Sequence, residues 1–379
     1  MGFLKGTAAA GLVLLSLLPA GCVESFLEPE PGDGPVTLFQ LVWEGFDRHY
    51  SYFGQKDLDW DAVRVEFGSR VTPETTEEEL FGVLSEMLLL LEDGHVNLYT
   101  PTDTFRYTGW YDDRPRNYNP DWVAFFYMGN NVFTTGNGRI RFGTLGQAVG
   151  YVHVGDFGGE GWMGDFDEAL LSLESSMELR GLVLDIRDNP GGTDSNIEAL
   201  AGRFTDRKRL YRYYQYRNGP EHDDFTELTE DHIEPRGLPF RKPVVILTNR
   251  RVFSAAEDFI LAMRTTGAMV VGDTTGGGFG NPMGRELPNG WTYRLSRWRE
   301  WTPDKELLVD GEGLVPDEVV VWATGGLQPG VDPILERGRA LVLEMAEPIE
   351  QIRESVGRGS DDEFDEVKEF KEFKGTESP

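Results

Sequence analysis

The chain has 379 residues, a length that suits about two or three structural units, and its formal net charge is −29. So large an excess of acid makes nucleic acid an unsuitable partner, because the phosphate backbone would be repelled. The same charge disfavours anionic substrates at long range, although the local field of a site can override it. The single cysteine, Cys22, can form no internal disulfide.

The first 21 residues have the composition of an export signal. Lys5 is the only charged residue before a run of apolar and small residues, 7–20, that is too short to span a membrane as a stable helix. Small residues then precede Cys22, as in bacterial lipoprotein signals, so we predict cleavage there and lipid attachment to Cys22. Pro19 is unusual in such a signal, and ordinary cleavage to a free periplasmic protein is the alternative.

The predicted anchor also predicts a location. We expect a lipid-anchored protein of the bacterial cell envelope that faces the periplasm, with residues 22–35 as its tether. Val23 stands where inner-membrane lipoproteins carry an aspartate, so the outer membrane is favoured by analogy. No other segment has the length and apolarity of a membrane-spanning helix.

Residues 36–95 repeat apolar side chains at helical spacing and are predicted to form a small N-terminal helical bundle. Residues 96–149 are predicted to be a β-rich connector, with β-like composition at Trp122 to Tyr127 and at Arg139 to Phe142. This interval is too short to hold a PDZ domain of roughly ninety residues.

From residue 150 the pattern changes to alternating strands and helices, which predicts an α/β catalytic domain over residues 150–345. Residues 346–379 are rich in acidic residues and are predicted to be a disordered tail. The elements expected in the α/β domain are strands at 151–154, 181–186, 244–248, 268–271, 291–297 and 319–322, and helices at 162–177, 196–204, 254–264 and 333–345.

Ser254 stands at a predicted junction between a strand and a helix. A serine there can be a nucleophile beside the free N–H groups of the helix start, or only a helix N-cap. Upstream, the stretch from Asp185 to Gly192 leaves a buried strand and turns through Pro190, Gly191 and Gly192. A glycine turn lets backbone N–H groups approach a ligand closely, so it could stabilise an oxyanion, or it could be only a tight turn.

Several ordered motifs resemble the S41 peptidases, which comprise the C-terminal processing proteases and the tricorn-core branch. The resemblance covers most of residues 36–340 and implies a crotonase/ClpP-like α/β catalytic domain. It further implies that Ser254 is the acylated nucleophile, and that the oxyanion hole is formed by the N–H groups of Ala255 and one of Gly191 or Gly192. The motifs that carry it are the segments 91–95, 185–192, 253–257, 272–276 and 311–317.

The general base distinguishes the branches of this family. The processing proteases use a lysine in a Gly-Lys-Gly turn after the serine, but here the turn is glycine-rich (276–280), and no lysine lies between Lys242 and Lys305. The chain therefore resembles the tricorn-type branch, whose base is a histidine after the helical region, and His95 matches it. Imidazole titrates near neutral pH and suits this role. His153, on the strand that enters the core, is the rival base.

The group that orients the histidine is less clearly matched. In the tricorn-type branch a glutamate acts through a second serine that precedes the histidine. Glu312 matches the glutamate, but Gly94 stands in the place of that serine. Glu312 would then reach the imidazole directly or through water, or another group would orient it. An exposed turn acid is the alternative interpretation of Glu312.

These observations predict a serine-type peptidase that hydrolyses peptide bonds through an acyl-enzyme at Ser254, with His95 as general base and a protein or peptide as substrate. No residues have metal-ligand spacing, no phosphate-binding loop is present, and no cofactor is expected. The alternative is a non-catalytic protein that uses the same fold to bind a peptide or an apolar ligand. The missing lysine and the missing second serine favour that alternative.

Overall fold

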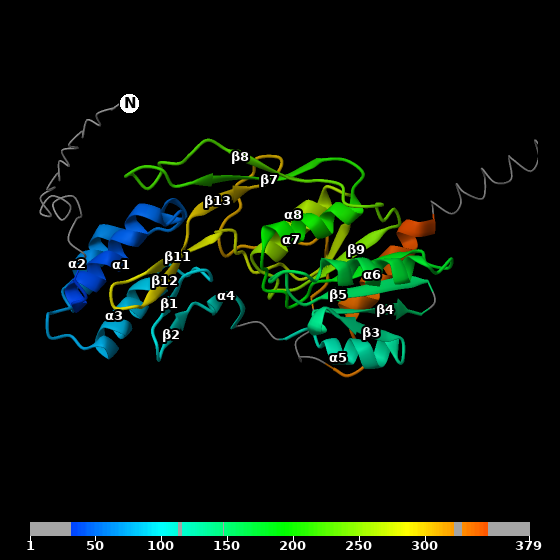
Figure 1. Cartoon of the computed structure of the whole chain (residues 1–379), viewed down its shortest axis with the longest axis horizontal. Helices are drawn as coiled ribbons and strands as arrows, with labels where there is room; N and C mark the ends of the chain where they lie inside the picture. Colours follow the sequence, from blue (N-terminus) through cyan, green and yellow to red (C-terminus); the bar gives the residue numbers. More distant parts are fainter. Residues whose placement is uncertain (1–31, 113–115, 147, 322–327, 348–379) are drawn as a thin grey trace, which may run out of the picture.

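The computed structural model describes residues 32–112, 116–146, 148–321 and 328–347. The predicted signal, Cys22, most of the tether and nearly all of the acidic tail lie outside these ranges. The described chain is elongated, with helices and a small sheet at one end and a larger α/β unit at the other (Figure 1). No helix in these ranges has the length and apolarity needed to span a lipid bilayer.

Three helices and a four-stranded sheet form the N-terminal end. The capping residues Asp59 and Thr76 begin the second and third helices, with a complete capping box between Thr76 and Glu79. The helices are α1 (Pro35–His49), α2 (Trp60–Gly68) and α3 (Glu77–Leu89). The sheet has the order β11-β12-β1-β2, with β1 Asn97–Tyr99, β2 Thr104–Arg106, β11 Pro282–Glu286 and β12 Thr292–Ser296.

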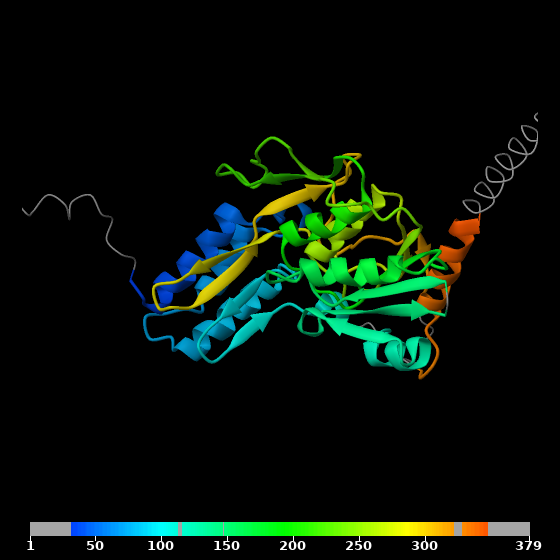
Figure 2. The ribbon, with the colours of Figure 1, turned by 45° about the vertical axis from the view of Figure 1, so that its right-hand side comes forward.

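The N-terminal core therefore combines two distant parts of the sequence (Figure 2). Phe46 of α1 stacks on Tyr293 of β12 with ring centroids 5.6 Å apart, and both side chains are buried. Gly45 allows this close approach, because a Cβ there would lie 1.9 Å from the Tyr293 hydroxyl. The contact holds β12 against the helices, and β12 in turn pairs with β1.

A seven-stranded sheet forms the centre of the larger unit, in the order β14-β10-β9-β6-β5-β4-β3. Its middle strands are parallel, and β3 and β4 continue it antiparallel at one edge. Every residue of β5, β6 and β9 is buried, as expected for strands covered on both faces. The strands are β3 Val132–Thr135, β4 Ile140–Leu145, β5 Val149–Val154, β6 Gly181–Asp185, β9 Val244–Thr248, β10 Met269–Gly272 and β14 Glu318–Val319.

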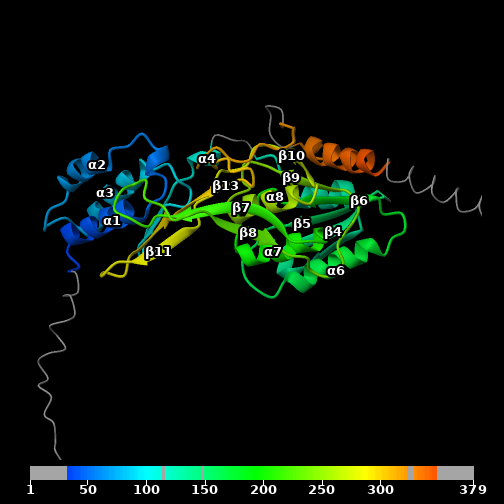
Figure 3. The ribbon, with the colours of Figure 1, turned by 90° about the horizontal axis from the view of Figure 1, so that it is seen from above.

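Helices cover the two faces of this sheet. Leu182 and Leu184 point into the core formed with α6 (Met163–Glu174), α7 (Asp194–Ala201) and α8 (Ala255–Arg264). Val183 points into a second core on the opposite face, which includes Leu335 and Val342 of the helix at residues 333–347. Figure 3 shows α6 and α7 on one side of the sheet and that helix, in orange, on the other. The α/β class predicted from the sequence is confirmed.

A third sheet, β13-β7-β8, lies beside α8, with β7 Arg209–Tyr216, β8 Thr229–Ile233 and β13 Trp298–Trp301. Strand β13 follows β12 after a single residue, so it leads the chain out of the N-terminal sheet. One local prediction was wrong. Residues 122–127 are helical rather than β-like, within α5 (Pro120–Val123) and the turn Ala124–Met128, because Asn119 caps the N–H groups of Asp121 and Trp122 and Pro120 suits a first helical turn.

Candidate active site

Ser254 lies at the turn between β9 and α8, directly before the first residue of the helix. Its backbone has φ 57° and ψ −136°, a conformation that costs a residue with a side chain of order 1–3 kcal/mol. The turn leaves the side chain half-buried in a pocket instead of inside the helix. Such strain persists only where surrounding contacts hold it, and the neighbouring glutamate provides them.

Glu257, one turn into α8, fastens the Ser254 turn to the glycine-rich loop. Its buried carboxylate accepts hydrogen bonds from the Ser254 N–H (3.0 Å), the Thr275 hydroxyl, and the N–H groups of Gly277 (2.8 Å) and Gly278 (2.7 Å). Burial raises the pKa of Glu257 to about 7, while these hydrogen bonds act in the opposite direction. The position of Glu257 in the sequence gives no sign of these distant donors.

His95 comes from the other end of the molecule, just before β1. Its Nε2 lies 3.0 Å from the Ser254 Oγ, although the two residues are 159 positions apart. The Asp93 carboxylate accepts the His95 N–H (2.7 Å) and the Ser296 hydroxyl (2.7 Å), which ties the segment to β12. The structure thus brings the predicted base to the predicted nucleophile.

The electrostatic setting of His95 favours the neutral imidazole. Burial lowers its pKa to about 4, partly opposed by Asp93 and reinforced by Arg294. A neutral ring can accept the serine proton through Nε2 when its own proton is on Nδ1. His153, the rival base, is buried in β5 with its ring 5.3 Å from that of Tyr118, and it has no hydrogen bond to Ser254.

An aromatic pair occupies the space beside the histidine. The rings of Trp110 and Phe253 stack at 4.4 Å, and Phe253 lies 4.7 Å from the imidazole. A Cβ at Gly94 would lie 2.7 Å from Phe253 Cζ and 2.8 Å from Trp110 Nε1, so a serine does not fit there without displacing the pair. A Cβ at Gly278 would lie 2.3 Å from Phe253 Cζ. Gly94 and Gly278 therefore leave room for the ring of Phe253.

The loop after β6 runs past Ser254 and is held by Asn189. The Asn189 carbonyl accepts the Phe253 N–H (3.1 Å), and its side-chain oxygen accepts the Gly191 N–H (2.9 Å). Gly191 has φ +95°, and a Cβ on it would lie 2.8 Å from Ser254 Cβ. The N–H groups of Gly192 and Ala255 donate no hydrogen bond within the described residues.

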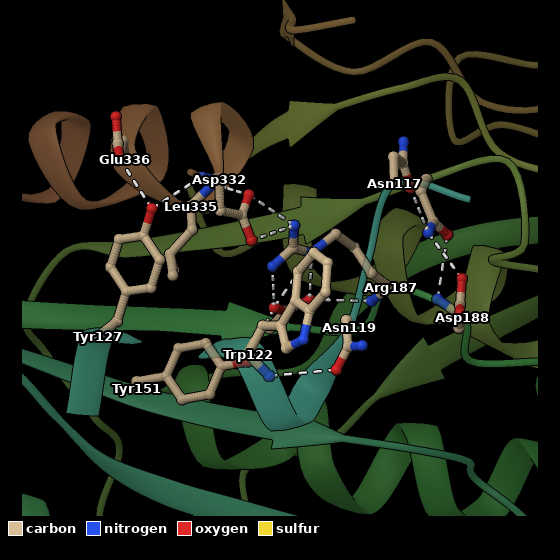
Figure 4. A network of polar contacts seen from close by, with 12 residues as sticks. Asn117, Asn119, Trp122, Tyr127, Tyr151, Arg187, Asp188, Asp332, Leu335 and Glu336 are labelled. Carbon is tan, nitrogen blue, oxygen red and sulfur yellow. Dashed lines mark hydrogen bonds and ion pairs between the residues drawn. The ribbon is translucent and has the colours of Figure 1, made fainter. Parts of the chain in front are cut away.

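A buried ion-pair network fixes the start of this loop (Figure 4). The guanidinium of Arg187 is fully buried and binds Asp185, at the end of β6, and Asp332, which precedes the helix at 333–347. It also lies 4.4 Å over the ring of Tyr118. A paired, hydrogen-bonded guanidinium anchors the loop to the helix on the far face of the sheet.

Glu312 is not brought to His95. Its side chain is exposed and makes no hydrogen bond to the imidazole, whose buried Nδ1 has no partner in the described chain. The backbone around it has a structural role, because Arg250 donates to the carbonyls of Gly311 (3.0 Å) and Thr275 (2.6 Å). This clamp was not foreseen from the sequence.

Ser254 and His95 open into a pocket of about 710 Å³ between the two ends of the molecule. Its walls come from the N-terminal sheet, from the segment around Trp110 and Tyr111, and from the loop of Gly191 and Gly192. No cluster of three or more potential metal ligands occurs in the ranges that the structure describes. Ser254 and His95 thus lie together at the wall of this cleft.

Comparison with known proteins identifies the family of the chain. The sequence model of peptidase family S41 matches residues 148–320, and that of the tricorn protease C1 domain matches residues 37–89. A candidate peptidase from Parabacteroides merdae has a crystal structure with TM-score 0.74 and 33% identity, covering 82% of this chain and 98% of that one. The tricorn protease shares only the fold, at TM-score 0.53 and 15% identity, covering 82% of this chain and 37% of that one.

The carboxy-terminal processing protease CtpB of Bacillus subtilis is 31% identical over 160 residues, which are 42% of this chain. The match spans about a third (31%) of that relative's length. The fold and these matches place the chain among the serine-type peptidases, a class of hydrolases. It belongs to peptidase family S41.

Proposed function

We propose that the chain hydrolyses peptide bonds with Ser254 as nucleophile and His95 as general base. The observation that carries this proposal is the 3.0 Å approach of His95 Nε2 to Ser254 Oγ in a solvent-connected pocket. The low pKa of the imidazole supports it, because the base is in its proton-accepting form at neutral pH.

In this mechanism the Ser254 Oγ attacks the carbonyl carbon of the scissile bond while its proton passes to His95 Nε2. The N–H groups of Ala255 and Gly192 would hold the oxyanion, since the Gly191 N–H is engaged by Asn189. His95 then returns the proton to the leaving amine, and a water activated by His95 cleaves the acyl-enzyme. Gly191 would contribute by letting the loop lie against Ser254.

Glu312 has no catalytic part in this proposal, because its exposed side chain makes no contact with the imidazole. We infer instead that packing orients His95. The ring lies against Phe253, and its backbone N–H is held by Asp93. Replacing Glu312 with Gln should therefore change the rate of hydrolysis by less than about twofold, far below the factor of about 10² or more expected for loss of a general base.

Labelling with a fluorophosphonate, which traps activated serines, tests the proposal. Wild-type protein should be labelled, Ser254→Ala should not be, and His95→Ala should be labelled at least about 10²-fold more slowly. His153→Gln is the matched control, because it removes the rival histidine and should leave the labelling rate unchanged. Folded wild-type protein that is not labelled at Ser254 would refute the enzyme and favour a peptide-binding protein on the same fold.

We also propose that Cys22 carries a lipid anchor and holds the chain in the cell envelope, facing the periplasm. The support is the apolar segment and the small residues that precede Cys22 in the sequence. Metabolic labelling with a palmitate analogue should mark the wild-type chain and not Cys22→Ala. A wild-type chain recovered without lipid from the soluble periplasmic fraction would contradict the anchor.

A further inference from the structure

A basic row crosses the N-terminal sheet within the pocket. Asn97 of β1 pairs directly with Arg294 of β12 on one side and with Arg106 of β2 on the other. Residues directly opposite one another in neighbouring strands share a face of the sheet, and the strands lie about 4.8 Å apart. The two arginines therefore flank Asn97, about 10 Å from each other by that spacing, and all three residues line the pocket.

In the part of the chain that the structure describes, these arginines have no carboxylate partner. Within the described ranges, neither Arg106 nor Arg294 takes part in an ion pair, and Arg106 only lies over the ring of Tyr99 at 5.6 Å. Arg251, also at the pocket wall, lies over Tyr111 at 4.2 Å and has no ion pair in that part of the chain. Three arginines without an ion pair among the described residues thus line one pocket.

The two acids that line the pocket are already engaged. Asp156 binds Arg139 (3.1 Å), and Asp188 forms an ion pair with Arg116 (3.5 Å). The excess of positive charge in the pocket is therefore local, in a chain that has 65 acidic and 36 basic residues. Arginines gathered in a cleft create a local positive potential that attracts an anion from solution.

The row also lies close to the reacting groups. Asn97 follows His95 by two residues, so their Cα atoms are at most about 7 Å apart, and the imidazole is 3.0 Å from the nucleophile. Arg294 is near enough to lower the pKa of His95. A substrate that reaches Ser254 would therefore pass the row within a few residues of its scissile bond.

We propose that Arg106 and Arg294 bind a carboxylate of the peptide substrate, close to the bond that is cleaved. This inference rests on the proposed function and gives it a substrate class, peptides with an anionic group near the scissile bond. A planar guanidinium can bind a carboxylate through two parallel hydrogen bonds, and both the free C-terminus and an acidic side chain offer that group. The row overrides, at short range, the repulsion that the total charge exerts on such substrates.

Binding at the row has a consequence for the base. A carboxylate on Arg294 would offset the positive charge that lowers the pKa of His95, so the imidazole would be more basic in the complex than in the free protein. The acid limb of kcat, which reports the complex, should then lie at higher pH than the acid limb of kcat/KM, which reports the free protein. With a neutral peptide the two limbs should differ less.

The test uses the full chain and peptides that it cleaves from a mixed peptide library, detected by mass spectrometry. One cleaved sequence is remade with a free C-terminus, with an amidated C-terminus, and with each Glu or Asp replaced by Gln or Asn. We expect kcat/KM to fall about tenfold or more on loss of the critical carboxylate, since a hydrogen bond to a charged group contributes about 1.5–3 kcal/mol. Sensitivity to amidation identifies the C-terminus as the source, and sensitivity to Gln or Asn identifies a side chain.

Variants then assign the effect to the row. In Arg294→Gln and Arg106→Gln the ratio of kcat/KM for the acid peptide to that for its neutral counterpart should approach one. Arg64→Gln is the matched control, because Arg64 is an exposed arginine of α2 without an ion pair in the described chain, and it should keep the wild-type ratio. Equal cleavage of acid and neutral peptides by wild-type protein, or a ratio that survives in both row variants, would overturn the inference.

Failure of this inference can be told apart from failure of the proposed function. If Ser254 is labelled and peptides are cleaved without preference for a carboxylate, only the role of the row is refuted. If Ser254 is not labelled and no peptide is cleaved, the peptidase itself is refuted. In that case the Ser254→Ala chain is titrated with a fluorescently labelled Glu-containing peptide, with its Gln counterpart, and with the amidated form of each, which still shows whether the row binds a carboxylate.

Discussion

Lowering the pH from 7 to 5 should destabilise the folded chain through His95. The unfolded imidazole, with an ordinary pKa of 6.5, takes up a proton in this window, whereas the buried ring, with a pKa of about 4, stays mostly neutral. The folded state therefore binds fewer protons than the unfolded state, and its stability falls as the pH falls. Integration over the window gives a loss of about 2 kcal/mol from this one group.

The assay is urea unfolding of the wild type and of His95→Gln at pH 7 and at pH 5. Other groups titrate in both proteins, so the difference between their pH dependences isolates His95. The wild type should lose about 2 kcal/mol more than the variant between the two pH values. The acid limb of kcat/KM should correspondingly fall well below pH 6.5.

Two results would refute the reasoning. One is an equal pH dependence of unfolding in the wild type and in His95→Gln. The other is an imidazole resonance of His95 that titrates near 6.5 in the folded protein, since that would show a solvated ring. Either result would mean that burial does not keep the base neutral, and that the pocket admits more water than the buried ring implies.

Three further predictions concern the parts that surround the dyad. Gly94→Ser should lower Tm and slow fluorophosphonate labelling, because its Cβ would lie 2.7 Å from Phe253 Cζ. Adding Phe253→Ala should restore part of the labelling, and a single variant that behaves like the wild type would contradict this packing. Glu257→Gln should lower the free energy of unfolding in urea by about 3 kcal/mol, because the amide nitrogen cannot accept hydrogen bonds from the N–H groups that the carboxylate binds. A labelling rate equal to that of the wild type would exclude Glu257 as a positioning residue. Asp332→Ala should lower the free energy of unfolding by about 3 kcal/mol, because it removes one partner of the fully buried Arg187 guanidinium. Asp121→Ala breaks an exposed ion pair and should change the free energy of unfolding little, so equal effects of the two variants would refute the anchoring role of Arg187.

The local elements of the larger unit could be predicted because their signals are local. The apolar run at Val244–Thr248 and the serine at the start of α8 are neighbours in sequence, and the structure places the strand and the helix there. The spacing of apolar residues and the capping residues determine such elements within about ten residues of chain. The segment at 122–127 was misassigned because its aromatic residues suggested a strand, whereas Asn119 and Pro120 begin a helix.

Motif order in the sequence also pointed to Ser254, His95 and the Gly191 and Gly192 turn as parts of one site. The sequence alone left open whether His95 or His153 approaches the serine, and what orients the base. The structure gives a short contact for His95 and none for His153. It leaves Glu312 exposed, and it places Phe253 and Trp110 where a second serine would have to fit.

The sequence by itself therefore determined the strands and helices of the α/β unit, and it pointed to the candidate nucleophile and its glycine turn. Only the tertiary structure decided which distant groups meet, because pairing of β1 with β12 joins segments almost two hundred residues apart. That pairing brings His95 to Ser254 and aligns Arg106 with Arg294 across Asn97. Strand register and packing set such contacts, and neither is encoded in the spacing of residues along a single segment.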